Sequence, residues 1–130
     1  MMKLKQLLPK NKKVFIWILL LALVIITIAT GIDYYIHTLE EEYTVPSTYF
    51  TNKIIYGGLF IFIILIIFRK LHPSNKAIIA ALVTSLLLEV KYTLQGYPKV
   101  FLIIFIFIHF GAILLPAWIL LGKFDKYIKT

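Results

Sequence analysis

Long uncharged apolar runs make up most of the chain, and the charged residues gather between them. Residues 14–32 form a run of 19. As a helix rising about 1.5 Å per residue, this run spans roughly 28 Å, close to the ~30 Å hydrocarbon core of a bilayer. Residues 54–68 lie between Lys53 and Arg69, whose long side chains reach toward the headgroups. Residues 100–122 form the longest run. These three runs predict transmembrane helices.

A fourth run, residues 77–88, is only 12 residues long before it meets Glu89. That length fits a re-entrant or buried segment as well as a full span. Ser74 follows Pro73 and precedes the run, so it is a plausible N-cap for a helix that starts there and continues past Lys91 to about Leu94. Such a helix is long enough to cross the membrane, and we expect four spans.

The distribution of charges and aromatic residues also favours four spans. With four, 11 of the 14 lysines and arginines face the cytoplasm and only Lys53, Lys91 and Lys99 face outward, whereas three spans divide them ten to four. Cytoplasmic segments carry the excess of basic residues, and tyrosines favour the membrane interface. Seven of the eight tyrosines then gather at the outer interface: Tyr34, Tyr35, Tyr43, Tyr49, Tyr56, Tyr92 and Tyr97.

The predicted fold is therefore all-α, an integral membrane bundle of four transmembrane helices with both termini cytoplasmic. Residues 1–130 form a single membrane domain, with helices at about 14–35, 52–69, 75–94 and 100–122 and an outer loop at 37–52. The basic start of the chain also resembles the first part of a signal peptide. The apolar run behind it is long for a signal peptide, which favours an uncleaved membrane anchor.

Composition excludes several classes of protein. The chain is 61% hydrophobic and only 15% charged, a balance that a soluble domain of this length could not hide from water. The absence of cysteine excludes disulfides, thiolate metal sites and cysteine nucleophiles. The net charge of +8 comes from basic residues that flank the apolar runs and form no continuous stripe, so we expect no nucleic acid partner.

The third predicted helix carries a regular row of small residues that ends in a carboxylate. Ala77, Ala81, Ser85 and Glu89 are spaced by four and therefore share one helix face. Small residues let a neighbouring helix approach closely, so we expect Ala77, Ala81 and Ser85 to pack against another helix. The same geometry turns Glu89 toward the interior of the bundle.

Polar side chains from all four predicted helices lie at a similar depth in the outer half of the membrane. The candidate binding residues are Glu89, His109, Asp33, His37, Lys53, Tyr56 and Tyr92. A structural interpretation stays open for each: Glu89 as a solvated helix-end carboxylate, His109 as a hydrogen-bonded structural histidine, and Asp33 with His37 as an i, i+4 ion pair. No HExxH-type spacing is present, and we expect no metal and no cofactor.

From Asn52 onward, the stretches "NKIIYG", "EVKYTLQGYPK" and "HFGAILLP" resemble the layout of the VanZ-like membrane proteins. Lys53, Glu89 and Gly111 match that pattern in kind, whereas Tyr56 and Tyr92 stand where the family tends to carry histidine and glutamine. The resemblance implies an activity at the cell envelope, which in some members is linked to glycopeptide antibiotic resistance.

The function that we predict is that of a small, multi-pass protein of the cell membrane that is not an enzyme. Through its outer half it would bind an envelope lipid, a glycopeptide component or a partner membrane protein, or associate with further copies of itself as a homo-oligomer. The alternative is an envelope-associated enzyme or a proton-coupled transporter in which Glu89 or His109 changes its protonation state.

Overall fold

The computed structural model describes residues 4–129, and helices dominate this part of the chain. Four segments are long and apolar enough to cross a membrane, which confirms the predicted all-α bundle of four transmembrane helices. The spans are α2 (Lys12–His37), a composite of α3 (Ser47–Asn52), the π-helical turn η2 (Lys53–Gly57) and α4 (Gly58–Ile67), then α5 (Pro73–Leu94) and α6 (Lys99–Phe124). Shorter elements are α1 (Leu4–Leu7) and two 3-10 turns, η1 (Glu41–Tyr43) and η3 (Asp125–Tyr127).

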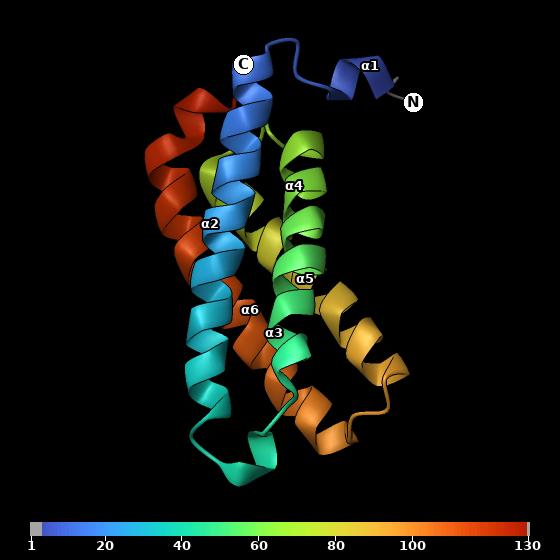
Figure 1. Ribbon diagram of the computed structural model, residues 1–130. Coiled ribbons are helices and arrows are strands. Elements are labelled where there is room, and N and C mark those ends of the chain that lie inside the picture. Colours follow the sequence, from blue (N-terminus) through green and yellow to red (C-terminus); the bar gives the residue numbers. More distant parts are fainter. Residues whose placement is uncertain (1–3, 130) are drawn as a thin grey trace.

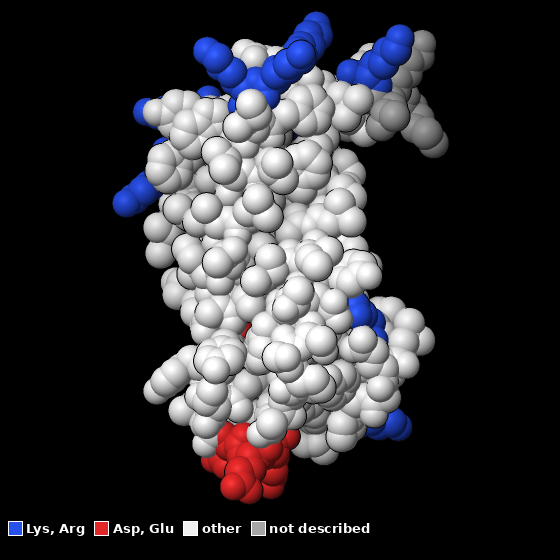
Figure 2. All heavy atoms as spheres, in the orientation of Figure 1, with Lys and Arg blue, Asp and Glu red and all other residues white. Residues whose placement is uncertain are grey.

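The spans run up and down, so both ends of the chain lie at the same end of the bundle (Figure 1). We call this the termini end, and the opposite end, which holds residues 38–46, the loop end. Most basic side chains gather at the termini end, a few more lie on one side of the loop half, and an acidic patch marks the loop end; most of the surface between the two ends is uncharged (Figure 2). The acidic patch comes from the exposed residues Glu40, Glu41 and Glu42. This uncharged surface is the one expected of a protein that faces lipid.

The third apolar run forms a complete span, because α5 extends it by several residues on both sides. The helix begins at Pro73, whose missing N–H costs nothing in the first turn. The cap is His72, two residues earlier than the expected Ser74: its ring nitrogen accepts a hydrogen bond from the Ser74 backbone N–H at 3.3 Å. The helix is therefore long and apolar enough to cross a membrane.

The second span starts five residues earlier than expected, at Ser47. Pro46 has an extended backbone with φ −61° and ψ 151°, a geometry that suits the residue just before a helix. The outer loop is correspondingly shorter than the predicted 37–52. This extra turn and a half carries Tyr49 into the interior, where the side chain is only 3% exposed.

A π-helical turn interrupts the second span at Lys53–Gly57. Gly57 lies so close to α2 that an added Cβ would come within 2.6 Å of Ile26 Cδ1. Glycine therefore permits the close approach of the two helices. The turn itself, a feature often found at functional sites, directs Lys53 into the bundle, where the side chain is fully buried.

The core follows the predicted small-residue face of α5. Ala77 and Ala81 are fully buried and Ser85 is 1% exposed. The core side chains around them are mainly isoleucine, leucine and alanine, while many leucines and isoleucines also remain exposed on the outside of the bundle. That outer surface is apolar because it faces lipid rather than water.

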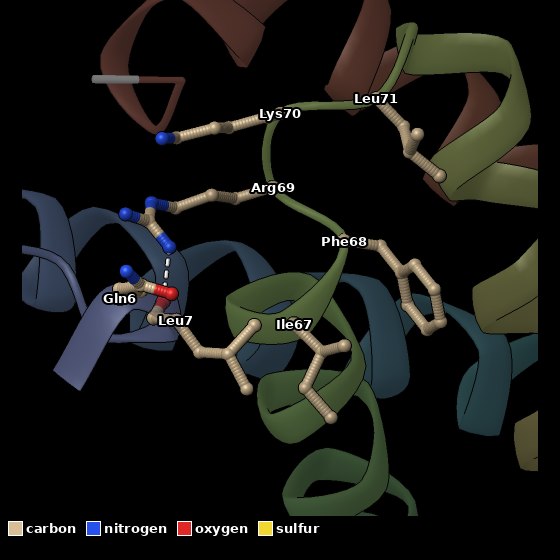
Figure 3. A pocket seen from close by; sticks show the side chains of 7 residues that line it. All are labelled: Gln6, Leu7, Ile67, Phe68, Arg69, Lys70 and Leu71. Carbon is tan, nitrogen blue, oxygen red and sulfur yellow. Dashed lines mark hydrogen bonds between the residues drawn. The ribbon is translucent and has the colours of Figure 1, made fainter. Parts of the chain in front are cut away.

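Ionic contacts close the bundle at the termini end. Lys76 Nζ pairs with Asp125 Oδ1 and donates a hydrogen bond to the Arg69 carbonyl oxygen at 2.7 Å. Arg69 in turn donates to the Leu7 carbonyl oxygen, which ties α1 to the α4–α5 connection (Figure 3). An open hollow of about 490 Å³ lies there between Gln6 and residues 67–71.

Candidate functional site

Seven buried side chains from all four spans meet toward the loop end, and we call them the polar cluster. Their exposed fractions all lie between 0% and 8%. They are Asp33 and His37 from α2, Tyr49 from α3, Lys53 from η2, Glu89 and Tyr92 from α5, and His109 from α6. Charged residues inside a membrane bundle are costly and mark functional sites by default.

The centre of the cluster is an ion pair between Asp33 and Lys53. Lys53 Nζ lies 3.0 Å from Asp33 Oδ2, and both side chains are fully buried. Among the described residues, neither oxygen of Asp33 accepts a hydrogen bond of acceptable geometry. The carboxylate is thus held mainly by the charge of Lys53, and it keeps further capacity to accept hydrogen bonds.

His109 links α6 to two other spans. Its Nδ1 lies 3.0 Å from Glu89 Oε1, and its Nε2 lies 2.8 Å from the hydroxyl of Tyr49. A carboxylate accepts hydrogen bonds, so Nδ1 carries the proton and donates it, while the Tyr49 hydroxyl donates to Nε2. The expected inward direction of Glu89 is what makes this contact with His109 possible.

The ring of His37 also uses Nδ1 as a hydrogen-bond donor, as the ring of His109 does. Its Nδ1 lies 2.5 Å from the backbone carbonyl oxygen of Tyr43, so Nδ1 is again the donor and Nε2 is left with a lone pair. Nε2 lies 3.4 Å from Asp33 Oδ2. The ring stacks on Phe105 with centroids 4.2 Å apart and planes inclined by 6°, which fixes its orientation.

Aromatic rings cover the cluster on the loop side. Tyr49 stacks on Tyr92 with centroids 4.6 Å apart, and Tyr97 meets Tyr92 edge-on at 5.8 Å. Tyr97 follows α5 outside the spans, and burial raises the pKa of its phenol, so the hydroxyl stays protonated. A hollow of about 260 Å³ opens beside these rings and is lined by Tyr49, Asn52, Tyr92 and Tyr97 among others.

The structure brings together six of the seven candidate binding residues from the sequence, and Tyr56 lies apart. Its side chain is 43% exposed, and Lys91 Nζ lies 5.0 Å from the centre of its ring. The π-helical turn directs Lys53 inward and leaves Tyr56 on the outside. Sequence reasoning missed Tyr49 because it placed this residue in a loop. The signal that could have found it is the Pro46–Ser47 pair, a typical helix start.

Three donor atoms in the cluster converge closely enough to hold a metal ion. The side chains are Asp33, His37 and His109, and one ligand atom from each lies within 4.8 Å of the others. All three side chains are buried. The arrangement can therefore bind a proton or a cation between α2 and α6.

Comparison with known proteins gives one family. The family model described as "Transmembrane adaptor Erv26" matches residues 13–128. No curated protein and no solved structure matches the chain. The match overturns the resemblance to the VanZ-like proteins: it identifies a different family and includes the first span, which that resemblance left out. The resemblance was wrong because it rested on the order of polar stretches, with Tyr56 and Tyr92 already departing from the family's pattern.

Proposed function

Because the chain belongs to the transmembrane adaptor Erv26 family, we propose that it is a non-catalytic adaptor that binds a transmembrane helix of a partner protein. The observation that carries this proposal is the match of the family model over nearly the whole chain, residues 13–128. An adaptor needs a surface for its partner, and in a bundle this small that surface lies on the lipid-facing side of the spans.

An apolar groove between α5 and α6 offers such a surface. Its volume is about 310 Å³, and its lining is apolar apart from Ser85. It is lined by Leu82, Ser85 and Leu86 from α5 and by Ile106, Phe107 and Phe110 from α6. Phe107 is 73% exposed at its edge. Exposed aromatic side chains beside a groove are typical anchors of protein interfaces.

Small residues beside the groove favour a helix as the occupant. Ser85 lies on its floor. Gly111, one turn after Phe107 on α6, is exposed, and an added Cβ there would meet nothing within 4 Å. Helices associate in membranes where small residues let their backbones approach. A partner helix could therefore pack along α6, with its side chains in the groove.

Site-specific photo-crosslinking in intact membranes tests this proposal. A photoreactive phenylalanine analogue in place of Phe107 should give a discrete adduct with another membrane protein. The matched control is the same analogue at Leu20, an apolar position of α2 that is 49% exposed. A Gly111→Trp variant should abolish the adduct at position 107, whereas Leu115→Trp, at an exposed position one turn further along, should leave it unchanged.

Three results would contradict the proposal. Adducts of equal yield at positions 107 and 20 would mean that the groove is not a specific surface. Adducts with lipid alone would mean that the groove contacts lipid and binds no protein. An adduct with the mass of two copies of this chain would mean that the groove binds a second copy of the chain and not another protein. The glycopeptide component expected from the sequence loses its support with the VanZ resemblance.

The orientation that fits this proposal places the termini in the cytoplasm, as the sequence predicts. It is supported by the exposed lysines at the termini end, where Lys10, Lys12, Lys13, Lys123 and Lys126 all lie, because basic residues stay on the cytoplasmic side. An impermeant amine reagent applied to intact cells should label Lys91 and Lys99. Labelling only after lysis would contradict this orientation. The cell membrane as the location stays a prediction.

A further inference from the structure

We propose that Asp33, His37 and His109 form a binding site for a divalent transition-metal ion of the zinc type, which cross-links α2 and α6. The proposal does not depend on partner binding, and it goes against the sequence expectation of no metal. Asp33 and His37 both lie on α2, whereas His109 lies on α6, more than 70 residues later in the chain than either of them. For that reason no local sequence motif indicates the site.

Two of the three separations between the donor atoms fit such an ion, and all three donor atoms lie within 4.8 Å of one another. Asp33 Oδ2 lies 3.4 Å from His37 Nε2 and 3.5 Å from His109 Nε2. Ligand atoms held about 2.0–2.1 Å from zinc at tetrahedral angles are about 3.3 Å apart. Imidazole nitrogens together with a carboxylate oxygen are also the donors that zinc accepts.

Both histidines are oriented as metal ligands usually are. His37 uses Nδ1 to donate to the Tyr43 carbonyl oxygen, and His109 uses Nδ1 to donate to the Glu89 carboxylate. A metal-binding histidine almost always donates its other N–H to a carbonyl or carboxylate, which fixes the tautomer. Both Nε2 atoms lie within 3.5 Å of Asp33 Oδ2. His109 Nε2 also accepts from the Tyr49 hydroxyl, so a bound ion would take the place of that hydrogen bond.

Buried acceptor atoms without a hydrogen-bond partner are a second, independent observation in favour of a metal site. Asp33 is fully buried, yet within the described part of the chain both of its oxygens, and His37 Nε2, lack a hydrogen-bond partner. A buried acceptor without a donor costs free energy, and a cation among the three acceptors removes that cost. Lys53 Nζ lies 3.0 Å from Oδ2, so the ion would share this oxygen with the ammonium group of Lys53.

Tyr49 lies between the site and the surface at the loop end. Its hydroxyl lies 2.8 Å from His109 Nε2. The same residue lines the hollow of about 260 Å³ at the loop end. An ion entering from that side would pass Tyr49, which gives the buried site the entry path that a metal site needs.

Titration of the full-length chain in detergent, after removal of metals with a chelator, tests the site. Co²⁺ serves as the spectroscopic probe and Zn²⁺ as its competitor. One equivalent of Co²⁺ should give the intense visible absorption of four-coordinate Co²⁺, and one equivalent of Zn²⁺ should remove it. His37→Ala and His109→Ala should each weaken binding by more than about 100-fold. Glu89→Gln, which disturbs only the orientation of His109, should weaken it by about 10–100-fold.

The chain offers a matched control in its third histidine, His72, which is exposed. His72→Gln keeps an acceptor at the start of α5 and should bind Co²⁺ as the unmodified chain does. Because the alanine variants could unfold, the unmodified chain is also melted with Zn²⁺, with Mg²⁺ and with chelator. Zn²⁺ should raise the melting temperature and Mg²⁺, which prefers six oxygen ligands, should not.

Two results would overturn the proposal. The first is an unmodified chain whose absorption and melting temperature are the same with Co²⁺ or Zn²⁺ as with chelator. The second is binding that persists at full affinity in His37→Ala and His109→Ala, which would place the metal elsewhere on the chain.

Discussion

The two halves of the bundle each bury a lysine against an aspartate, but the surroundings of the two pairs differ. Lys76 Nζ has both Asp125 and the Arg69 carbonyl oxygen, and Lys129 approaches the same aspartate at 3.4 Å from the surface. Lys53 faces Asp33 without any hydrogen bond of acceptable geometry. The first pair closes helix ends at the membrane interface, whereas the second lies among histidines inside the bundle. Burial of the charges alone therefore does not distinguish the two pairs; the acceptor atoms around Asp33 that lack a hydrogen-bond partner do.

The largest effect is expected from Asp33→Ala, which leaves Lys53 buried without its counter-charge. Breaking a buried pair by removing one partner costs about 3–5 kcal/mol. Reversible unfolding in mixed micelles should show a loss of this size. The double variant Asp33→Ala with Lys53→Met is the control, because it removes both charges and should recover much of the stability. A double variant as unstable as the single one would mean that packing, and not charge, makes Asp33 important.

A smaller loss of unfolding free energy is expected from Asp125→Ala, which removes the aspartate of the pair with Lys76. Lys76 would keep its hydrogen bond to the Arg69 carbonyl oxygen, and the Asp125 side chain is 11% exposed, so water can replace part of the contact. Leaving such a group partly unsatisfied costs about 1–3 kcal/mol. The same unfolding assay measures it. A loss equal to that of Asp33→Ala would remove the distinction between the two pairs.

Tyr49→Phe should cost about 0.5–1.5 kcal/mol, because it removes one hydrogen bond, that to His109 Nε2 at 2.8 Å. The ring stacking on Tyr92 stays. The control is Tyr34→Phe, since Tyr34 is 57% exposed and should change nothing measurable. Equal stability of Tyr49→Phe and Tyr34→Phe would show that the hydroxyl of Tyr49 does not hold the cluster together.

The smallest effect is expected from Lys91→Met at the surface of the loop end. Lys91 Nζ lies 5.0 Å from the centre of the Tyr56 ring, and an exposed cation–π contact contributes about 0.5–1 kcal/mol. Lys99→Met, at an exposed position, is the comparison and should be neutral. A loss of several kcal/mol for Lys91→Met would place Tyr56 in the cluster, against its exposure.

The sequence by itself determined the number of spans and the depth of the polar residues. Both follow from local properties: the length of the apolar runs decides whether a helix can cross a membrane, and a spacing of four places residues on one helix face. The order of the polar stretches did not identify the family. Matching residue types along the chain does not show which way each side chain points.

Only the tertiary structure decided which polar residues meet. The π-helical turn at Lys53–Gly57 rotates Lys53 inward and Tyr56 outward, and the early start at Ser47 brings Tyr49 to His109. The start at Ser47 has a local signal in Pro46–Ser47, whereas the π-helical turn has none, because it accompanies the close approach of Gly57 to Ile26 of α2. The pairing of Glu89 with His109 likewise requires α5 and α6 to pack at one particular register. Spacing along a single helix specifies a face, but the packing of four helices decides what that face meets.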